Sequence, residues 1–163
     1  MPTFKGSLAE LCGHFPKQGE KAHEFILVNQ KLEDVHLKDS SGKKRVLSIF
    51  PSLDTGVCLK SNKEMNAIAK EHPHIAFYAI SADLPFASGR ICGLENINNL
   101  TTLSMMRSKQ FGLDYGLLLK NTPLAGLLTR AVIVIDAHDK IEYIEVVDEI
   151  THEPNFVELK KHL

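Results

Sequence analysis

Continuous apolar runs separated by one amphipathic segment set the pattern of this chain. Runs at residues 46–50, 75–80 and 131–135 are typical of strands buried on both faces. Between the first two runs, residues 57–71 have helical spacing, and His72-Pro73 ends the helix. Its apolar face consists of Cys58, Ser61, Met65, Ile68 and Ala69. The pattern predicts a strand–helix–strand unit with parallel strands and a right-handed crossover.

Weaker patterns predict further elements on both sides of this unit. They are, in chain order, a β-hairpin and short strands within residues 3–40, including the apolar run Phe25–Val28, a helix at 103–111, a turn at 136–140 leading to a strand at 141–147, and a C-terminal helix containing Phe156, Leu159 and Leu163. The run Ala131–Ile135 is then a central strand. This order of strands and helices along the chain is that of an α/β, thioredoxin-like fold with an N-terminal β-hairpin extension. We expect one domain over residues 1–163.

Composition and charge exclude several classes of function. The 163 residues are 44% apolar with a net charge of −1, ordinary values for one soluble globular domain. Neither nucleic acid nor an anionic membrane is expected as a partner. No run approaches the roughly 20 apolar residues of a membrane helix, and the first residues lack the apolar core of a signal peptide. We therefore expect a cytoplasmic protein.

The chain has three cysteines, Cys12, Cys58 and Cys92. An odd, small number argues against a secreted disulfide scaffold. No two of them form a CxxC motif, so the disulfide-exchange motif of thioredoxin itself and a zinc ribbon are both excluded. The histidines are scattered without the i, i+4 spacing of a helical zinc site, and we expect no metal or organic cofactor. Cys12 is expected to be an inert thiol.

Cys58 lies in the first turn of the predicted helix, where unpaired N–H groups and a partial positive charge stabilise anions. The thiolate, the reactive form of cysteine, is favoured there. An ordinary thiol is only about 3% thiolate at pH 7, and reaching roughly 90% takes about 3.4 kcal/mol of stabilisation. A helix terminus supplies about 0.3–2 kcal/mol, so a cation should lie beside this thiol. The alternative is an inert cysteine buried in the core.

The segment Pro51-Ser52-Leu53-Asp54-Thr55-Gly56-Val57-Cys58 matches the Pro-x-x-x-Thr-x-x-Cys pattern of peroxiredoxins. The chain most resembles the bacterial thiol peroxidases, which are atypical two-cysteine peroxiredoxins, from about residue 3 to its end. Further segments that carry the resemblance are residues 81–87 with Arg90 and Cys92-Gly93, residues 130–136 and residues 147–154.

The resemblance implies a role for five residues. Cys58 is the peroxidatic cysteine, which attacks a peroxide and becomes a sulfenic acid, and Cys92 is the resolving cysteine of an intramolecular disulfide. Thr55 holds the peroxide, Arg130 supplies the cation and a donor, and Pro51 shields the pocket from water. The alternatives are a pure helix N-cap for Thr55, a solvated strand-end charge for Arg130 and a bystander thiol for Cys92.

The family also implies hydrogen peroxide and alkyl or lipid hydroperoxides as substrates, thioredoxin as reductant, antioxidant defence and a homodimer built near the active site. Because a disulfide needs Cα atoms within about 7 Å, we expect local unfolding of the first helical turn and of the glycine- and asparagine-containing residues 85–98. Two competing functions are a redox sensor that uses the same cysteine pair and a protein-disulfide oxidoreductase, which the absence of CxxC disfavours.

Overall fold

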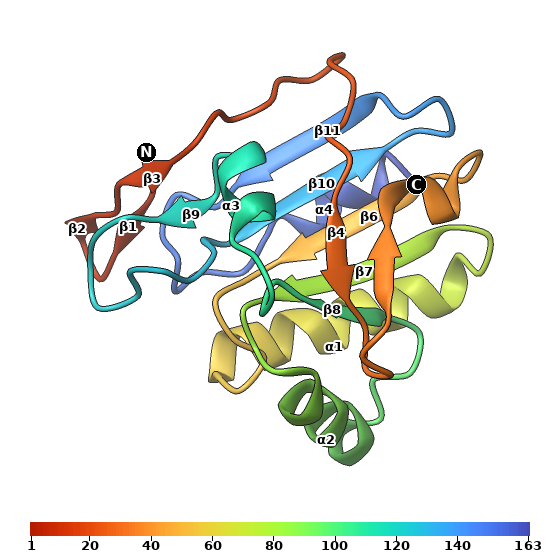
Figure 1. The fold of residues 1–163 in the computed structure, drawn as a ribbon, viewed down its shortest axis with the longest axis horizontal. Coiled ribbons are helices and arrows are strands. Elements are labelled where there is room, and N and C mark those ends of the chain that lie inside the picture. Colours follow the sequence, from red (N-terminus) through yellow and green to blue (C-terminus); the bar gives the residue numbers. More distant parts are fainter.

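A mixed sheet of seven strands forms the centre of the computed structural model, which describes residues 1–163 (Figure 1). In spatial order the strands are β11 (Ile141–Val146), β10 (Ala131–Ile135), β6 (Arg45–Ile49), β7 (Ala76–Ser81), β8 (Thr101–Ser104), β4 (Ile26–Val28) and β5 (Asp34–His36). The helices are α1 (Gly56–Glu71), α2 (Pro85–Glu95), α3 (Gln110–Asp114) and α4 (Phe156–Lys160), with a short 3-10 turn at Leu37–Ser40. The α/β, thioredoxin-like fold is confirmed.

Successive side chains of a strand point to opposite faces of the sheet, and both faces are covered, so the sheet lies between two buried layers. Val132 and Val134 point into the layer formed with α1, α2 and α4, whereas Ile133 and Ile135 point to the opposite layer with α3. All five residues of β10 are fully buried, which explains its uninterrupted apolar sequence. The sequence prediction of a buried strand here is confirmed, although β7, rather than β10, is the middle strand of the seven.

The unit β6–α1–β7 forms as the apolar pattern predicts. β6 and β7 pair in parallel from Arg45 opposite Ala76 to Ile49 opposite Ile80, and α1 connects them. The buried residues of α1 include the predicted face, Cys58, Ser61, Met65, Ile68 and Ala69. Because a short loop, residues 50–55, leads from the end of β6 into this helix, the start of α1 lies at the carboxyl edge of the sheet, a common position for active sites in α/β folds.

The N-terminal hairpin is also present, as a pair of two-residue strands, β1 (Thr3–Phe4) and β2 (Ser7–Leu8). It lies at one side of the molecule next to the small sheet of β3 (Leu11–Cys12) and β9 (Leu118–Leu119), as Figure 1 shows. A minor core holds this corner together, made of Ala9, Leu119 and Ile150. The extension therefore packs against the C-terminal part of the chain.

The predicted helix at residues 103–111 is wrong. Thr101–Ser104 is strand β8, which pairs in parallel with β7 and meets β4 at Ser104, and only residues 110–114 are helical. Sheet pairing with two neighbours overrides the helical spacing of the apolar residues, and the two threonines favour a strand. The second helix along the chain is instead α2, which starts at Pro85 and ends at its C-cap residue Asn96, whose backbone is in the left-handed conformation.

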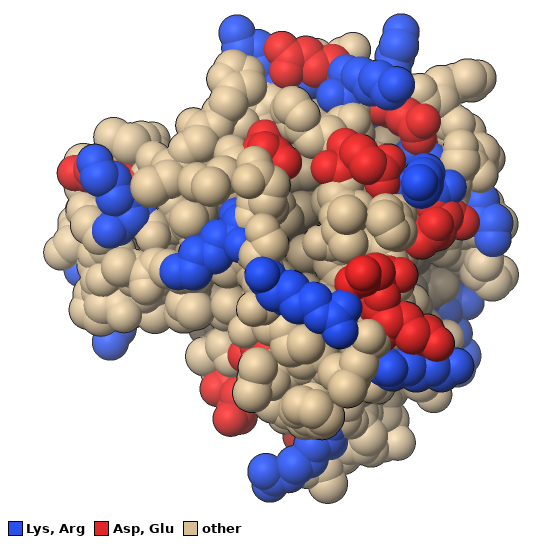
Figure 2. Space-filling view, viewed as in Figure 1, with Lys and Arg blue, Asp and Glu red and all other residues tan.

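Charges of both signs are interspersed on the face shown in Figure 2, as the small net charge suggests. None of the helices has the length and apolar character needed to span a membrane.

Candidate active site

Cys58 is the third residue of α1 and is 1% exposed. Its side chain belongs to the apolar layer that also contains Phe50 and Leu53. Thr55 is the N-cap residue, with an extended backbone, and its carbonyl accepts the first helical bond from Leu59. The predicted helix-terminal thiol is therefore present, in surroundings that exclude water from the sulfur.

Arg130 provides the cation that the sequence argument requires. Its Nη2 donates to Cys58 Sγ at 3.2 Å, and its Nε donates to the carbonyl of Ile150 at 2.9 Å. The side chain directly precedes β10 and is buried, with 3% exposure, so the alternative of a solvated charge is wrong. A guanidinium fixed at two points in a place of low polarity interacts strongly with a thiolate.

Pro51 and Thr55 belong to the loop between β6 and α1, which leads to Cys58. Pro51 is a buried residue of this loop, whereas Thr55 is exposed. The Thr55 hydroxyl donates to the carbonyl of Ser52 at 3.1 Å and does not cap the helix through its side chain. Its N-cap position is as predicted, but the hydroxyl makes no hydrogen bond to the Cys58 sulfur, whose bond comes from Arg130.

Asn62 supports the first turn of α1 from inside the core. It is fully buried, and its Nδ2 donates to the carbonyl of Cys58 at 2.9 Å. Its Oδ1 accepts from Ser48 Oγ of β6 at 3.1 Å. The turn that carries the thiol is thus tied to the sheet by a satisfied polar pair, which fixes its position more narrowly than apolar packing does.

Glu149 connects the N-terminal hairpin to the segment that holds Arg130. Its carboxylate accepts five hydrogen bonds, from Thr3 Oγ1, from the amides of Lys5 and Gly6, and from the amide and hydroxyl of Thr151. Desolvation alone raises the pKa of this carboxyl, but the bonds from Gly6, Thr151, Thr3 and Lys5 outweigh it and lower the pKa to about 2. The next residue is Ile150, whose carbonyl anchors Arg130.

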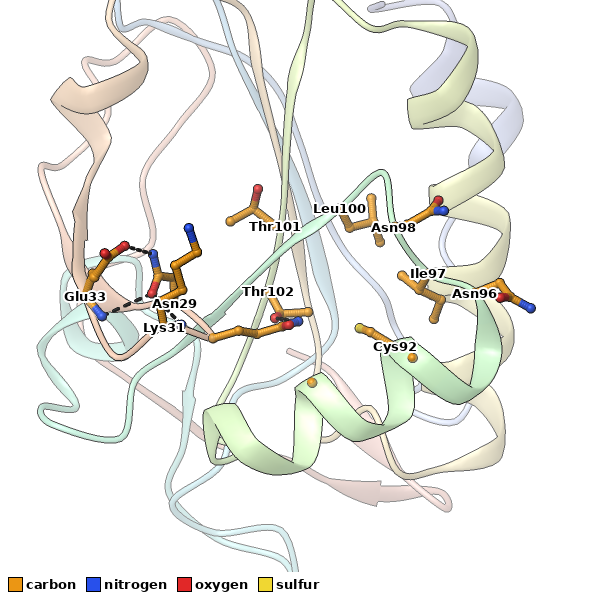
Figure 3. A pocket seen from close by; sticks show the side chains of 13 residues that line it. Asn29, Lys31, Glu33, Cys92, Asn96, Ile97, Asn98, Leu100, Thr101 and Thr102 are labelled. Carbon is orange, nitrogen blue, oxygen red and sulfur yellow. Dashed lines mark hydrogen bonds between the residues drawn. The ribbon is translucent and has the colours of Figure 1, made fainter.

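Cys92 lies in α2 and is 6% exposed. Burial raises the pKa of its thiol, and a hydrogen bond with Gln30 acts in the opposite direction. Figure 3 shows Cys92 beside a hollow of about 530 Å³ between the β4–β5 turn, α2 and β8. The walls of this hollow combine polar and apolar surface, and their polar side chains include those of Asn29, Gln30, Asn96, Asn98, Thr101 and Thr102.

The two thiols belong to one apolar layer but are not bonded to each other, since all three cysteines are free. Cys12 lies in the partly exposed strand β3, in the β region where the sequence places it. No group of three or more His, Cys, Asp or Glu side chains could hold a metal ion. Among the side chains near the start of α1 the structure shows a buried thiol with a fixed guanidinium, and a second thiol lies in the same apolar layer.

Sequence reasoning missed Asp83, which lies between β7 and α2. Its carboxylate accepts from Ser52 Oγ at 2.7 Å, from the amide of Leu53 at 2.7 Å and from Ser81 Oγ at 2.9 Å. Asp83 belongs to residues 81–87, which carry the family resemblance, but the resemblance implies no role for it. Asn62 was missed as well, although its position four residues after Cys58 on the same helical face is a signal that a polar residue is buried there.

A buried, arginine-paired thiol at the start of a helix in a thioredoxin-like fold defines a thiol-dependent redox enzyme. The family model for the redoxins matches residues 17–160. A thiol peroxidase of Corynebacterium glutamicum is 46% identical over 153 residues, covering 94% of this chain and 92% of the relative. The chain therefore belongs to the redoxin family, among the thiol peroxidases of the peroxiredoxin group, and is a peroxidase.

Solved structures agree with this assignment. The peroxiredoxin-like protein of Aquifex aeolicus superimposes with a TM-score of 0.94 at 35% identity, covering 99% of this chain and 94% of the other. The thiol peroxidase of Chromobacterium violaceum gives a TM-score of 0.91 at 24% identity, covering 99% and 93% of the two chains. The second similarity is evidence for the fold.

Proposed function

We propose that the enzyme reduces hydroperoxides through an atypical two-cysteine cycle within one subunit. The Cys58 thiolate attacks one peroxide oxygen, the O–O bond breaks, and the sulfur becomes a sulfenic acid while water or an alcohol leaves. Cys92 then attacks the sulfenic sulfur, which forms the Cys58–Cys92 disulfide and releases water. Thioredoxin reduces this disulfide by thiol exchange and restores both thiols.

The observation that carries the proposal is the 3.2 Å hydrogen bond from Arg130 to the Cys58 sulfur. The guanidinium stabilises the thiolate before the reaction, and it is placed to donate to the oxygen on which negative charge develops as the O–O bond breaks. Thr55 is the second donor, once its hydroxyl turns from the Ser52 carbonyl towards a bound peroxide. Pro51 closes the pocket to water and takes no part in proton transfer.

The surroundings of the two thiols support the finer parts of the proposal. Phe50 and Leu53 belong to the same apolar cluster as Cys58, and apolar surroundings of the thiol favour alkyl and lipid hydroperoxides alongside hydrogen peroxide. The hollow beside Cys92 gives a reductant an approach to the resolving side of the cycle. The cycle requires a reducing compartment with thioredoxin, so we assign the enzyme to the cytoplasm and to antioxidant defence.

We further propose a homodimer that covers the exposed apolar side chains of α2. Leu84 next to this helix is 55% exposed, and Phe86 and Leu94 within it are 68% and 69% exposed. Met106 lines a hollow of about 370 Å³ together with Leu84, which extends the apolar area towards the following loop. Exposed apolar side chains of this kind are typical of an association surface, and Leu94 lines a hollow together with Asp54 of the loop that precedes α1.

The proposed cycle is tested by intact mass and non-reducing peptide mapping after one equivalent of hydrogen peroxide, on the wild type and on Cys92→Ser. We expect a Cys58–Cys92 linked peptide in the wild type and a sulfenic acid on Cys58 in the variant, with Cys12→Ser behaving as wild type. Turnover with thioredoxin, thioredoxin reductase and NADPH tests the reductant. An unmodified Cys58 would contradict the cycle, and oxidation without turnover would favour the redox-sensor alternative.

A further inference from the structure

Asp83 joins the two loops that lead into the cysteine-bearing helices. Ser52 and Leu53, which both donate to its carboxylate, precede α1, whereas Asp83 itself lies two residues before Pro85, the first residue of α2. Leu53 is 1% exposed, so its amide has no access to water as a substitute partner. One carboxylate thus holds together the approaches to both redox-active thiols.

This Asp83 junction, made of Asp83 with Ser52, Leu53 and Ser81, extends to the pocket residue Thr55. The carbonyl of Ser52 accepts from the Thr55 hydroxyl. On its other side the junction is anchored to the sheet, because Ser81 Oγ donates to the carboxylate at 2.9 Å and Ser104 Oγ donates to the Asp83 carbonyl. The loop before Cys58 is therefore fixed to the ends of β7 and β8 through Asp83.

Resolution of the sulfenic acid requires this arrangement to open. A disulfide needs the two Cα atoms within about 7 Å, and both thiols are buried in intact helices. We expect the first turn of α1 and the α2 segment to unwind so that the thiols can meet, and this unwinding separates Ser52 and Leu53 from the Asp83 carboxylate. Each bond that stabilises the closed form over the open one therefore slows disulfide formation.

We propose that Asp83 is a positioning residue that sets the ratio between resolution and overoxidation of Cys58, an inference that rests on the cycle proposed above. In resolution, the Cys92 thiol attacks the sulfenic sulfur, the S–S bond forms, the S–O bond breaks, and the hydroxyl leaves with the thiol proton as water. In overoxidation, a second hydroperoxide transfers an oxygen atom to the sulfenic sulfur, giving a sulfinic acid and water or an alcohol. The closed form supports only the second reaction.

The test measures the products of a single turnover. Reduced protein is mixed with hydrogen peroxide over a range of concentrations in excess, and intact mass gives the fractions that end as disulfide and as sulfinic acid. The midpoint is the hydrogen peroxide concentration at which the two fractions are equal. It equals the rate constant of resolution divided by the rate constant of the second oxidation. Because a hydrogen bond to a charged group changes an equilibrium about tenfold or more, Asp83→Ala should raise the midpoint about tenfold or more.

Two milder variants and a matched control accompany Asp83→Ala. Ser52→Ala removes one donor, and Asp83→Asn removes the charge while keeping one acceptor oxygen, so both should raise the midpoint by a smaller factor. Asp136→Asn is the control, because Asp136 likewise accepts two amide bonds, from His138 and Lys140, at the far end of β10. It should lower the melting temperature without moving the midpoint.

A midpoint that stays at the wild-type value in the Asp83 and Ser52 variants would overturn the inference. If Asp83→Ala does not fold, the midpoints of Asp83→Asn and Ser52→Ala decide the question in its place. A wild type that yields both products, with no shift in the variants, refutes the role of Asp83 alone. A wild type that yields neither product refutes the proposed function, and the role of Asp83 with it.

Discussion

Replacement of Arg130 by methionine should slow the reaction of Cys58 with hydrogen peroxide by about three orders of magnitude. A hydrogen bond to a charged group contributes about 1.5–3 kcal/mol, so loss of the 3.2 Å bond reduces thiolate stabilisation by about 10- to 150-fold. Removal of one donor to a developing charge lowers rates by about 100- to 1,000-fold. Because both effects come from one side chain they do not simply multiply, and about 1,000-fold is the expected result.

Two rate constants separate these effects. Stopped-flow mixing with hydrogen peroxide reports the whole loss, whereas alkylation by iodoacetamide reports only the reactivity of the thiolate in the ground state. We expect Arg130→Met to lower alkylation by about 10- to 150-fold and peroxide reduction by a larger factor. Arg130→Lys keeps the charge but loses the second anchor on the Ile150 carbonyl, and it should fall between the wild type and Arg130→Met.

The control is Arg107→Met, which removes an exposed arginine paired with Asp34 at the surface. Surface pairs of this kind contribute about 0–1 kcal/mol, and both rate constants should stay at wild-type values. A folded Arg130→Met protein that reduces hydrogen peroxide within a factor of about three of the wild type would refute the reasoning, because neither effect leaves so much activity.

Three further predictions concern stability and assembly. Glu149→Gln should lower the melting temperature measured by calorimetry at neutral pH. Because the Glu149 pKa of about 2 lies below its ordinary value of 4.5, the difference in melting temperature from wild type should be complete above about pH 4.5 and should vanish as the pH falls through about 2. Asn62→Ala leaves the buried Ser48 hydroxyl without a partner and should reduce the free energy of unfolding in urea by about 1–3 kcal/mol. An unchanged free energy of unfolding would contradict a structural role for this pair. Phe86→Glu should convert a dimer to a monomer in sedimentation velocity, whereas a wild type that is already monomeric would contradict the proposed interface.

The sequence predicts those elements whose burial produces a regular pattern. Helix α1 and strands β6, β7 and β10 follow from apolar periodicity because each packs along its whole length against other elements. The sequence pattern places the second helix at residues 103–111 instead of at α2, because α2 lacks such a regular pattern. Its buried residues, Pro85, Ser88 and Cys92, give no continuous apolar face, whereas Leu103 and Phe111 have a spacing that fits a helix although the first lies in a strand.

The candidate site was predictable where a local motif carries it. The position of Cys58 at the helix start follows from nearby residues, and the need for a cation follows from the energetics of a thiolate. The choice of Arg130 as that cation came from family resemblance, since it lies 72 positions further along the chain. Hydrogen bonds such as those of Asp83 and Glu149 join segments distant in sequence, and no local pattern determines which partners meet.

The presence of both thiols in the apolar layer beneath the sheet ties their redox equilibrium to folding. In the proposed cycle, the Cys58–Cys92 disulfide forms only when part of that packing is disrupted, so its reduction restores packing that the disulfide form lacks. For a two-electron couple, each 1.4 kcal/mol of packing regained on reduction raises the reduction potential by about 30 mV. In the proposed cycle the core thereby favours reduction of the disulfide, and a substitution that loosens the layer around Met65 or Ile68 should make the disulfide harder to reduce.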